Sequence, residues 1–229
     1  MINSKLESYL VPISIVVAGL IIGASLLFLG QNGPVNTESL PSGPPAAADQ
    51  FQKVKLTEEI DASQDPVLGN PEAVLLMVEF SDFQCPFCRR HHEQTFPELK
   101  AKYFDTGKVK LVFKDFPLPI HENAQAAAEA GQCAFEQGKF WEYQDKLFDN
   151  QEALAKDGLK KYAGELGLNQ AQFDVCLDSG KFRQRVKDDV ALGQKLGVNG
   201  TPGFLVGDRL IEGAYPFSAF EAAIEEQLK

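Results

Sequence analysis

The residues with the clearest chemistry in this chain are two cysteines in the sequence Cys85-Pro86-Phe87-Cys88. Two thiols at this spacing can close a disulfide and reopen it by exchange with the thiols of another molecule. The same spacing also occurs in zinc half-sites and in disulfides that only stabilise a fold. The elements that flank the pair help to choose between these interpretations.

The motif lies between a strand-like run and a helix-like run. An apolar stretch over residues 74–80 precedes it, and a helical pattern over residues 89–103 follows it. Pro86 suits the first position of a helix, because its missing N–H would have no intrahelical partner there. Unpaired N–H groups and the positive end of the helix dipole favour a thiolate at such a helix start. We therefore predict that Cys85 is the exposed nucleophile and that Cys88 is the thiol that resolves mixed disulfides.

Composition sets limits on the possible partners. The chain has 229 residues, a hydrophobic content of 44% and a formal net charge of −10. The length and the apolar content are sufficient for one packed domain with an additional segment. The acidic balance argues against a nucleic-acid partner, because phosphate contacts need clustered Lys and Arg.

The N-terminal region predicts a membrane anchor. Residues 10–30 carry no charge and are mostly Ile, Val, Leu, Gly and Ala. At ~1.5 Å per helical residue, such a segment spans the ~30 Å hydrocarbon layer. Lys5 precedes it and no basic residue follows until Lys53, so residues 1–9 are expected in the cytoplasm. Residues 31–50 read as a flexible linker before a folded domain at 51–229. The alternative is a cleaved secretory signal, and either version exports the domain.

The remaining two cysteines, Cys133 and Cys176, lie in helix-like segments with apolar neighbours. Disulfides persist on the exported side of a membrane. With Cys85 and Cys88 committed to the motif, the sequence predicts a structural disulfide between Cys133 and Cys176. Two separate buried thiols are the alternative.

The order of elements predicts an α/β fold with an insertion. After the motif come a strand at 109–116, a helical stretch at 122–179 and a helix at 181–196. Two short strands within 203–211 and a final helix at 219–228 complete the chain. The helical block interrupts an otherwise ordinary α/β layout, so we expect a helical subdomain inserted at about 120–190.

Several segments together resemble the DsbA-like thioredoxin-fold family over residues 65–228. The matching segments are Asp65-Pro66-Val67-Leu68-Gly69-Asn70, Glu79-Phe80-Ser81-Asp82-Phe83-Gln84-Cys85-Pro86-Phe87-Cys88, Phe140-Trp141-Glu142-Tyr143, Leu147-Phe148 and Gly197-Val198-Asn199-Gly200-Thr201-Pro202. The resemblance implies a thioredoxin fold with an inserted helical subdomain. It also implies thiol:disulfide exchange between cysteines, and we expect no cofactor.

The resemblance assigns roles to individual residues. Cys85 and Cys88 become the catalytic pair, and Pro202 becomes a cis-proline that faces them. Thr201, Pro202 and Phe87 are expected to form the substrate-binding surface, where the backbone of Thr201 pairs with an extended substrate chain.

Glu79 is the candidate proton donor and acceptor. It precedes Cys85 by six residues, and similar proteins carry a buried acid at this place. A carboxyl group in a low-dielectric site has a raised pKa and can relay a proton to the thiol of Cys88. Lys114, on the neighbouring strand, is a hypothetical ion-pair partner of Glu79. The Pro-Phe pair between the cysteines supplies no positive charge that would stabilise the Cys85 thiolate. The sequence therefore does not determine the redox potential of the dithiol.

Two histidines follow the motif and raise the question of a metal site. His91 and His92 are adjacent, and adjacent residues of a helix point about 100° apart. Both therefore cannot easily join one site with Cys85, and we expect no metal.

Taken together, these patterns predict a membrane-tethered, extracytoplasmic thiol:disulfide oxidoreductase that works as a monomer. Its substrates would be exported proteins with reduced cysteines, and a membrane redox partner would reoxidise it. A reductase or isomerase is the alternative within the same class. A thiol-independent chaperone or a metal carrier is the alternative from another class, and activity that survives Cys85→Ser would indicate it.

Overall fold

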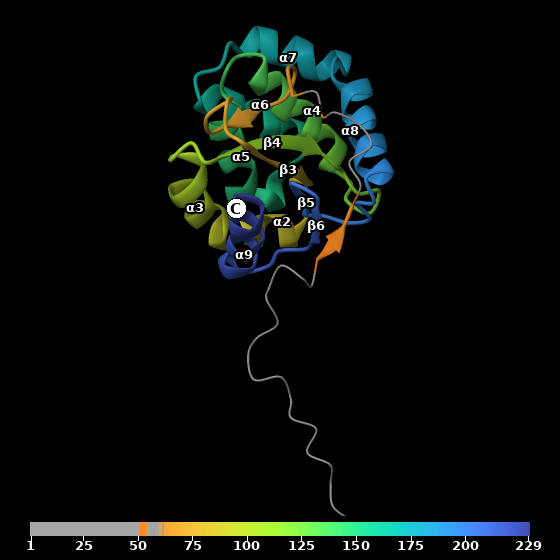
Figure 1. Cartoon of the computed structure of the whole chain (residues 1–229). Helices are drawn as coiled ribbons and strands as arrows, with labels where there is room; N and C mark the ends of the chain where they lie inside the picture. The colour runs from red at the N-terminus through yellow and green to blue at the C-terminus, as the bar shows by residue number, and fades with distance from the viewer. Residues whose placement is uncertain (1–50, 55–59, 61) are drawn as a thin grey trace, which may run out of the picture. The chain divides into compact units, whose positions relative to one another are not determined.

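A six-stranded mixed sheet forms the centre of the folded domain. The computed structural model describes residues 51–54, 60 and 62–229 (Figure 1). The strands are β1 (Gln52–Lys53), β2 (Val67–Leu68), β3 (Leu75–Ser81), β4 (Val109–Asp115), β5 (Gly203–Val206) and β6 (Arg209–Glu212). Their order in the sheet is β1-β6-β5-β3-β4-β2. β3 pairs in parallel with β4 and antiparallel with β5, so the strand that leads into the cysteine motif is central.

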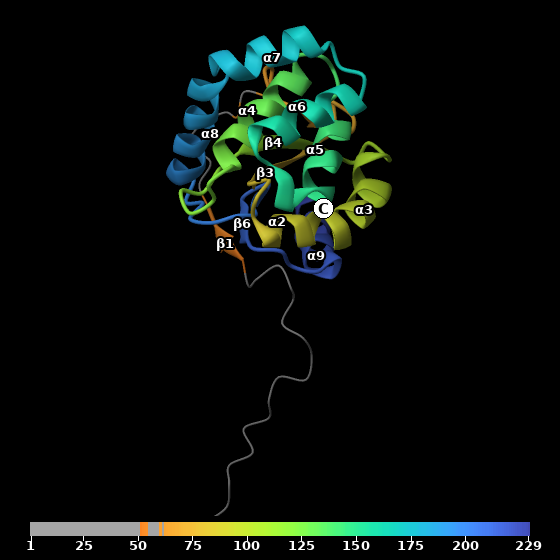
Figure 2. The same ribbon diagram turned by 180° about the vertical axis from the view of Figure 1, so that it is seen from behind.

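Helices pack on this sheet and form the insertion. They are α2 (Pro86–Gln94), α3 (Phe96–Leu99), α4 (Ala124–Phe135), α5 (Phe140–Asp149), α6 (Lys156–Glu165), α7 (Gln170–Ser179), α8 (Arg183–Lys195) and α9 (Phe217–Gln227), with a π-helical turn η1 (Lys100–Phe104) and a 3-10 turn η2 (Gln151–Ala153). Figures 1 and 2 show α7 and α9 at opposite ends of the domain. By residue number, the insertion predicted at about 120–190 corresponds to α4–α7 and most of α8.

Alternation along the strands separates the two faces of the sheet. Leu75 and Met77 of β3 join a core with residues of α3 and α9. Val78 and Phe80, one residue out of step, join a second core with Leu196 beside α8. Successive strand residues point to opposite faces, so β3 is buried on both sides.

The helix predicted after the motif is divided into three pieces. α2 ends at Gln94, α3 begins at Phe96, and η1 continues from Lys100. Pro97 has no N–H to donate to the preceding turn, so the first helix ends before it. The helical stretch predicted at 122–179 is likewise several helices. Gly138 lies between α4 and α5 with a φ of +71°, and Gly167 lies between α6 and α7 with a φ of +69°. Glycine adopts this left-handed backbone without steric cost.

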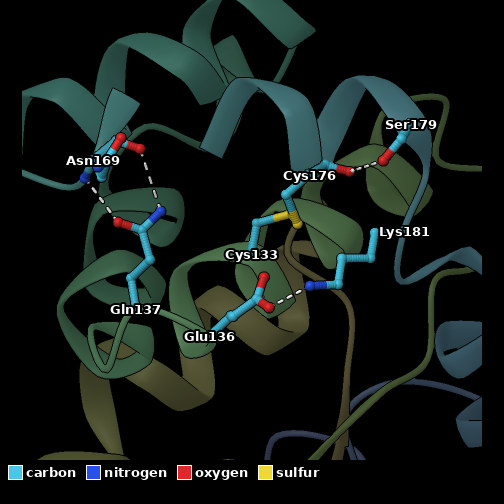
Figure 3. Close-up of a disulfide and its surroundings, with 7 residues drawn as sticks. All are labelled: Cys133, Glu136, Gln137, Asn169, Cys176, Ser179 and Lys181. Atoms are coloured by element: carbon cyan, nitrogen blue, oxygen red, sulfur yellow. Dashed lines mark hydrogen bonds and ion pairs between the residues drawn. A yellow bond between two sulfur atoms is a disulfide. The ribbon is translucent and has the colours of Figure 1, made fainter. Parts of the chain in front are cut away.

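The insertion contains the disulfide predicted between Cys133 and Cys176. Their sulfurs are 2.01 Å apart and their Cα atoms 6.0 Å apart, and the bond joins α4 to α7 (Figure 3). Beside it, Lys181 forms an ion pair with Glu136. Both cysteines are buried among apolar residues of the insertion, so this bond is shielded from thiols in solution.

The predicted membrane anchor lies outside the described residues. Among residues 51–54, 60 and 62–229, no helix combines the length and the apolar character needed to cross a membrane. The segment at 10–30, for which the sequence predicts a span, is not part of that range.

Replacing both insertion cysteines, as in Cys133→Ala with Cys176→Ala, should destabilise the protein. The bond joins residues separated by 43 positions. Closing a loop of this length restricts the unfolded chain and thereby stabilises the folded protein by about 4 kcal/mol. Urea denaturation should show this loss in the free energy of unfolding. Oxidation kinetics of Cys85 and Cys88 should stay unchanged, and a loss confined to redox activity would contradict a structural role.

Candidate active site

The two cysteines of the motif lie at the N-terminal end of α2. Cys85 precedes the helix in an extended conformation, and Pro86 is the first helical residue. The Cys85 carbonyl accepts a hydrogen bond from the N–H of Arg89 at 3.1 Å, which closes the first turn. Cys85 and Cys88 are both free thiols, so the structure describes the reduced form.

Cys85 is set up to ionise. The Cys88 thiol is the main cause that lowers the pKa of Cys85, to about 6, and the Thr201 side chain and the N–H groups of Cys88 and Phe87 add to it against the effect of burial. The prediction that Cys85 is exposed is wrong in degree, because only 3% of the residue is accessible. Cys85 shares an apolar core with residues of the insertion, and its thiol contacts the Thr201 carbonyl in the loop before β5.

Cys88 has the opposite character. It is fully buried, and burial raises its pKa well above the ordinary value, with the neighbouring Cys85 as the next cause. Its sulfur accepts a hydrogen bond from the Asp82 N–H at 3.4 Å. A thiol that cannot ionise unaided needs a proton acceptor before it can attack a mixed disulfide.

Glu79 and Ser81 project from the same face of β3 and are both buried. Burial raises the pKa of Glu79 to about 7, against the opposing effects of the Ser81 hydroxyl and His92. The same hydroxyl lowers the pKa of Cys88. Its oxygen has no hydrogen-bond partner of standard geometry in the described part of the chain. Ser81 thus lowers the pKa of both the carboxyl and the buried thiol, an influence that sequence reasoning missed.

The loop before β5 faces the nucleophile. The Thr201–Pro202 peptide bond is cis, as the resemblance implied. The Cys85 thiol donates to the Thr201 carbonyl at 3.4 Å across 116 positions of sequence. Both Thr201 and Pro202 are buried, whereas Phe87 of the motif is 53% exposed.

Lys114 does not pair with Glu79. In the register of β3 and β4, Glu79 lies opposite Phe113, and Lys114 lies opposite Phe80. Lys114 therefore points to the other face of the sheet. There its ammonium group binds Asp65 at 2.7 Å and Asp189 of α8 at 3.1 Å. This buried cluster joins the insertion to the sheet and leaves Glu79 without a cationic partner from β4.

Asp82 is a second residue that sequence reasoning missed. Its carboxylate accepts from the N–H groups of Gln84 at 2.7 Å and Leu118 at 2.8 Å, and it contacts His121 Nδ1 at 2.7 Å. Asp82 thereby ties the loop after β4 to the segment before Cys85. Its position three residues before the nucleophile was a signal, since Asp readily accepts from the N–H groups of a turn.

The two adjacent histidines lie in different surroundings. His91 is buried with its ring 4.5 Å from that of Phe204, and burial lowers its pKa to about 3. His92 contacts Asp145 of the insertion at 3.2 Å. Within the described ranges, no group of three or more His, Cys, Asp or Glu side chains is placed to hold a metal ion.

Comparison with known proteins assigns the family. A family model described as Thioredoxin matches residues 61–226. In structure, the chain is similar to oxidised BdbD from Bacillus subtilis, with a TM-score of 0.69 and 25% identity over 78% of this chain and 97% of that one. It is also similar to a thioredoxin-like oxidoreductase from Silicibacter pomeroyi, with a TM-score of 0.66 and 31% identity over 74% of this chain and 98% of that one. For alpha-DsbA1 of Wolbachia pipientis the TM-score is 0.64, with 26% identity over 76% and 94%.

The chain belongs to the thioredoxin family. Its fold, its dithiol and these structural neighbours place it among the DsbA-like thiol:disulfide oxidoreductases.

Curated relatives extend the comparison to longer proteins. Na(+)/H(+) antiporter NhaA 3 of Salinispora tropica is 36% identical over 172 residues, which are 75% of this chain and 26% of that protein. NhaA 1 of Mycolicibacterium gilvum is 35% identical over 175 residues, which are 75% and 28%. The chain thus spans about a quarter of the length of these relatives.

The reactivity of Cys85 should depend on the thiol of Cys88. In the reduced protein, alkylation by iodoacetamide should rise with a midpoint near pH 6, the pKa of Cys85. In Cys88→Ala the midpoint should move upward, because the largest cause of that low pKa is removed. Peptide mass spectrometry identifies the labelled residue, and preferential labelling of Cys88 below pH 8 would reverse the assignment.

The buried carboxyl of Glu79 should leave a signature in stability. Its pKa rises from 4.5 to about 7 on folding, so the folded state binds more protons between these values. The stability that it contributes is present below pH 4.5 and is lost as the pH rises through 7, a loss of about 3 kcal/mol.

Glu79→Gln should therefore remove this slope and be more stable than wild type at pH 8. Urea denaturation at pH 4.5, 6 and 8 measures it. The matched control is Glu98→Gln, at an exposed carboxyl of α3, which should keep the wild-type profile. Parallel profiles for wild type and Glu79→Gln would refute the raised pKa.

Proposed function

We propose that this protein is an extracytoplasmic oxidase of thiols, tethered to the membrane through residues 10–30, which introduces disulfides into exported proteins. The observation that carries the proposal is the difference in pKa between the two thiols of the motif, beside the contact of the Cys85 thiol with the Thr201 carbonyl. Cys85 has a pKa of about 6, whereas the pKa of Cys88 is far above its ordinary value. A thiolate at Cys85 stabilises the reduced form relative to the disulfide by ~1.4 kcal/mol for each pH unit of its lowered pKa, which favours transfer of oxidising equivalents to a substrate.

The chemical steps follow from this asymmetry. A substrate thiolate attacks the Cys85 sulfur of the Cys85–Cys88 disulfide, and Cys88 leaves. The buried Cys88 thiolate takes a proton from Glu79, whose pKa near 7 keeps it partly protonated at neutral pH. A second substrate thiolate then attacks the substrate sulfur of the mixed disulfide, and Cys85 leaves as a stable thiolate. The substrate has lost two electrons to the dithiol and two protons to the solvent, and Glu79 recovers from the solvent the proton that it gave to Cys88.

The surroundings of Cys85 suit an unfolded polypeptide. The Thr201 carbonyl faces the sulfur and can pair with a backbone N–H of an extended substrate, the role that Thr201 and Pro202 have by resemblance. Phe87 is exposed with the Arg90 guanidinium 5.0 Å from its ring centre, and Ile120 is exposed on the loop after β4. Apolar side chains of this kind bind chains that have not yet buried their own.

The dithiol must be reoxidised after each turnover. We assign this step to a membrane redox partner, because a tether at 10–30 would keep the domain beside the bilayer. The similarity to proteins named as Na(+)/H(+) antiporters supports a place at the membrane. Neither step needs a resident cofactor, and the domain is proposed to work as a monomer.

A redox titration of the full-length protein against glutathione tests the direction of exchange. We expect a potential nearer to about −120 mV, the range of strong oxidants, than to about −270 mV, the range of reductases. The protein should also oxidise reduced ribonuclease A, and Cys85→Ser should abolish this. A potential near that of reductases would overturn the oxidase assignment. Activity that survives Cys85→Ser would indicate a chaperone or metal carrier instead.

A further inference from the structure

One residue of the helical insertion reaches the backbone of the nucleophile directly. Gln151, in the short turn η2, donates from Nε2 to the Phe83 carbonyl at 2.8 Å and to the Cys85 carbonyl at 2.9 Å. These contacts span 68 and 66 positions of sequence. Only 7% of Gln151 is accessible, so water cannot readily take over either bond.

The two carbonyls belong to the segment that determines where the Cys85 sulfur lies. The Cys85–Pro86 peptide has no N–H, so only its carbonyl can hold the orientation of that plane. This carbonyl accepts from Arg89 N at 3.1 Å and from Gln151. Without the side-chain donor, the buried Phe83 carbonyl would lose the partner that Gln151 provides, which is costly in an apolar site.

The turn that carries Gln151 is itself held in place. The Tyr162 hydroxyl of α6 donates to the Ala153 carbonyl at 3.1 Å, and the Asn150 side chain donates to the Lys146 carbonyl of α5 at 2.9 Å. On the neighbouring surface, the rings of Phe148 and Phe83 lie 5.3 Å apart. The amide of Gln151 is thus presented from a packed part of the insertion rather than from a mobile side chain.

We propose that Gln151 is a positioning residue, through which the insertion fixes the Cys85–Pro86 peptide plane directly after the nucleophile and the Phe83–Gln84 plane one residue before it. The proposal builds on the thiol-exchange function and adds a residue that does not touch the reacting sulfurs. Carbonyl groups carry the negative ends of peptide dipoles, so their orientation beside a thiolate changes its stability. The insertion then sets the ionisation of Cys85 in addition to covering it.

The test uses the reduced full-length protein and the absorbance of the Cys85 thiolate at 240 nm as a function of pH. Gln151→Met keeps a similar volume without a donor, and Gln151→Glu keeps the shape but opposes the two carbonyls with a carboxylate. The titration midpoint, near 6 in wild type, should rise by about one pH unit in Gln151→Met and further in Gln151→Glu. The equilibrium with glutathione should move about tenfold toward the disulfide form.

The matched control is Gln144→Met. Gln144 is equally buried on α5, and its Oε1 has no hydrogen-bond partner in the described structure. This variant should keep the wild-type midpoint even if it melts at a different temperature. An unchanged midpoint in a folded Gln151 variant, or an equal rise in Gln144→Met, would overturn the proposal. If Gln151→Met does not fold, Gln151→Asn decides, because it keeps a neutral amide that is one methylene too short to reach both carbonyls.

The titration needs no substrate, so its result does not depend on the direction of exchange. A protein that proved to be a reductase but showed the expected rise would contradict the proposed function and support the role of Gln151. A protein that proved to be an oxidase but showed no rise in the titration midpoint would support the proposed function and contradict the role of Gln151.

Discussion

The Cys85 sulfur lies between the Cys88 thiol and the Thr201 carbonyl, at the N-terminal end of α2. Its low pKa depends first on a hydrogen bond from Cys88, and Cys88 can donate only while it keeps its proton. Full burial keeps that proton in place, because an apolar site penalises a second thiolate. The chemistry therefore needs a dithiol that is buried on one side and approachable on the other, and much of the fold serves this requirement.

The central sheet provides the burial on one side of the dithiol. β3 is central, with β4 and β5 on its two sides, so its last residues are surrounded by apolar side chains. That burial raises the pKa of Glu79 toward neutrality, which is what its proposed role as proton donor to Cys88 requires. The ion cluster of Lys114, Asp65 and Asp189 lies on the opposite face. Had Lys114 faced Glu79, the carboxyl would be held as an anion and could not serve as an acid.

The insertion closes the site from the other side. Phe83, Cys85 and Cys88 belong to the same apolar core as the aromatic residues of α5 and the disulfide of α4 and α7. The disulfide fixes two helices of this subdomain to each other, and Gln151 and Asp82 attach the surrounding loops to the segment before the nucleophile. Packing and polar contacts thus act on the same few residues of backbone.

Local sequence was sufficient for features that depend on neighbours along the chain. The Cys-Pro-Phe-Cys motif, its place between a strand and a helix, and the central strands follow from apolar alternation and from Pro86, which act within a few residues. The pairing of Cys133 with Cys176 followed from the number of cysteines and their apolar surroundings. The cis bond before Pro202 followed only from resemblance, because no local pattern separates it from an ordinary X-Pro bond.

Tertiary structure decided the features that depend on distant segments. Strand register placed Lys114 on the face away from Glu79, and pairing of β3 with β4 is not visible in either strand alone. The low accessibility of Cys85 arises from Thr201 and from the insertion, which approach from far along the chain. Gln151 belongs to no recognisable sequence motif. Its amide becomes significant only because folding brings it against the Phe83 and Cys85 carbonyls. The sequence alone thus determined where the dithiol lies, whereas the packing of remote segments determined the protonation, the access and the support of its two thiols.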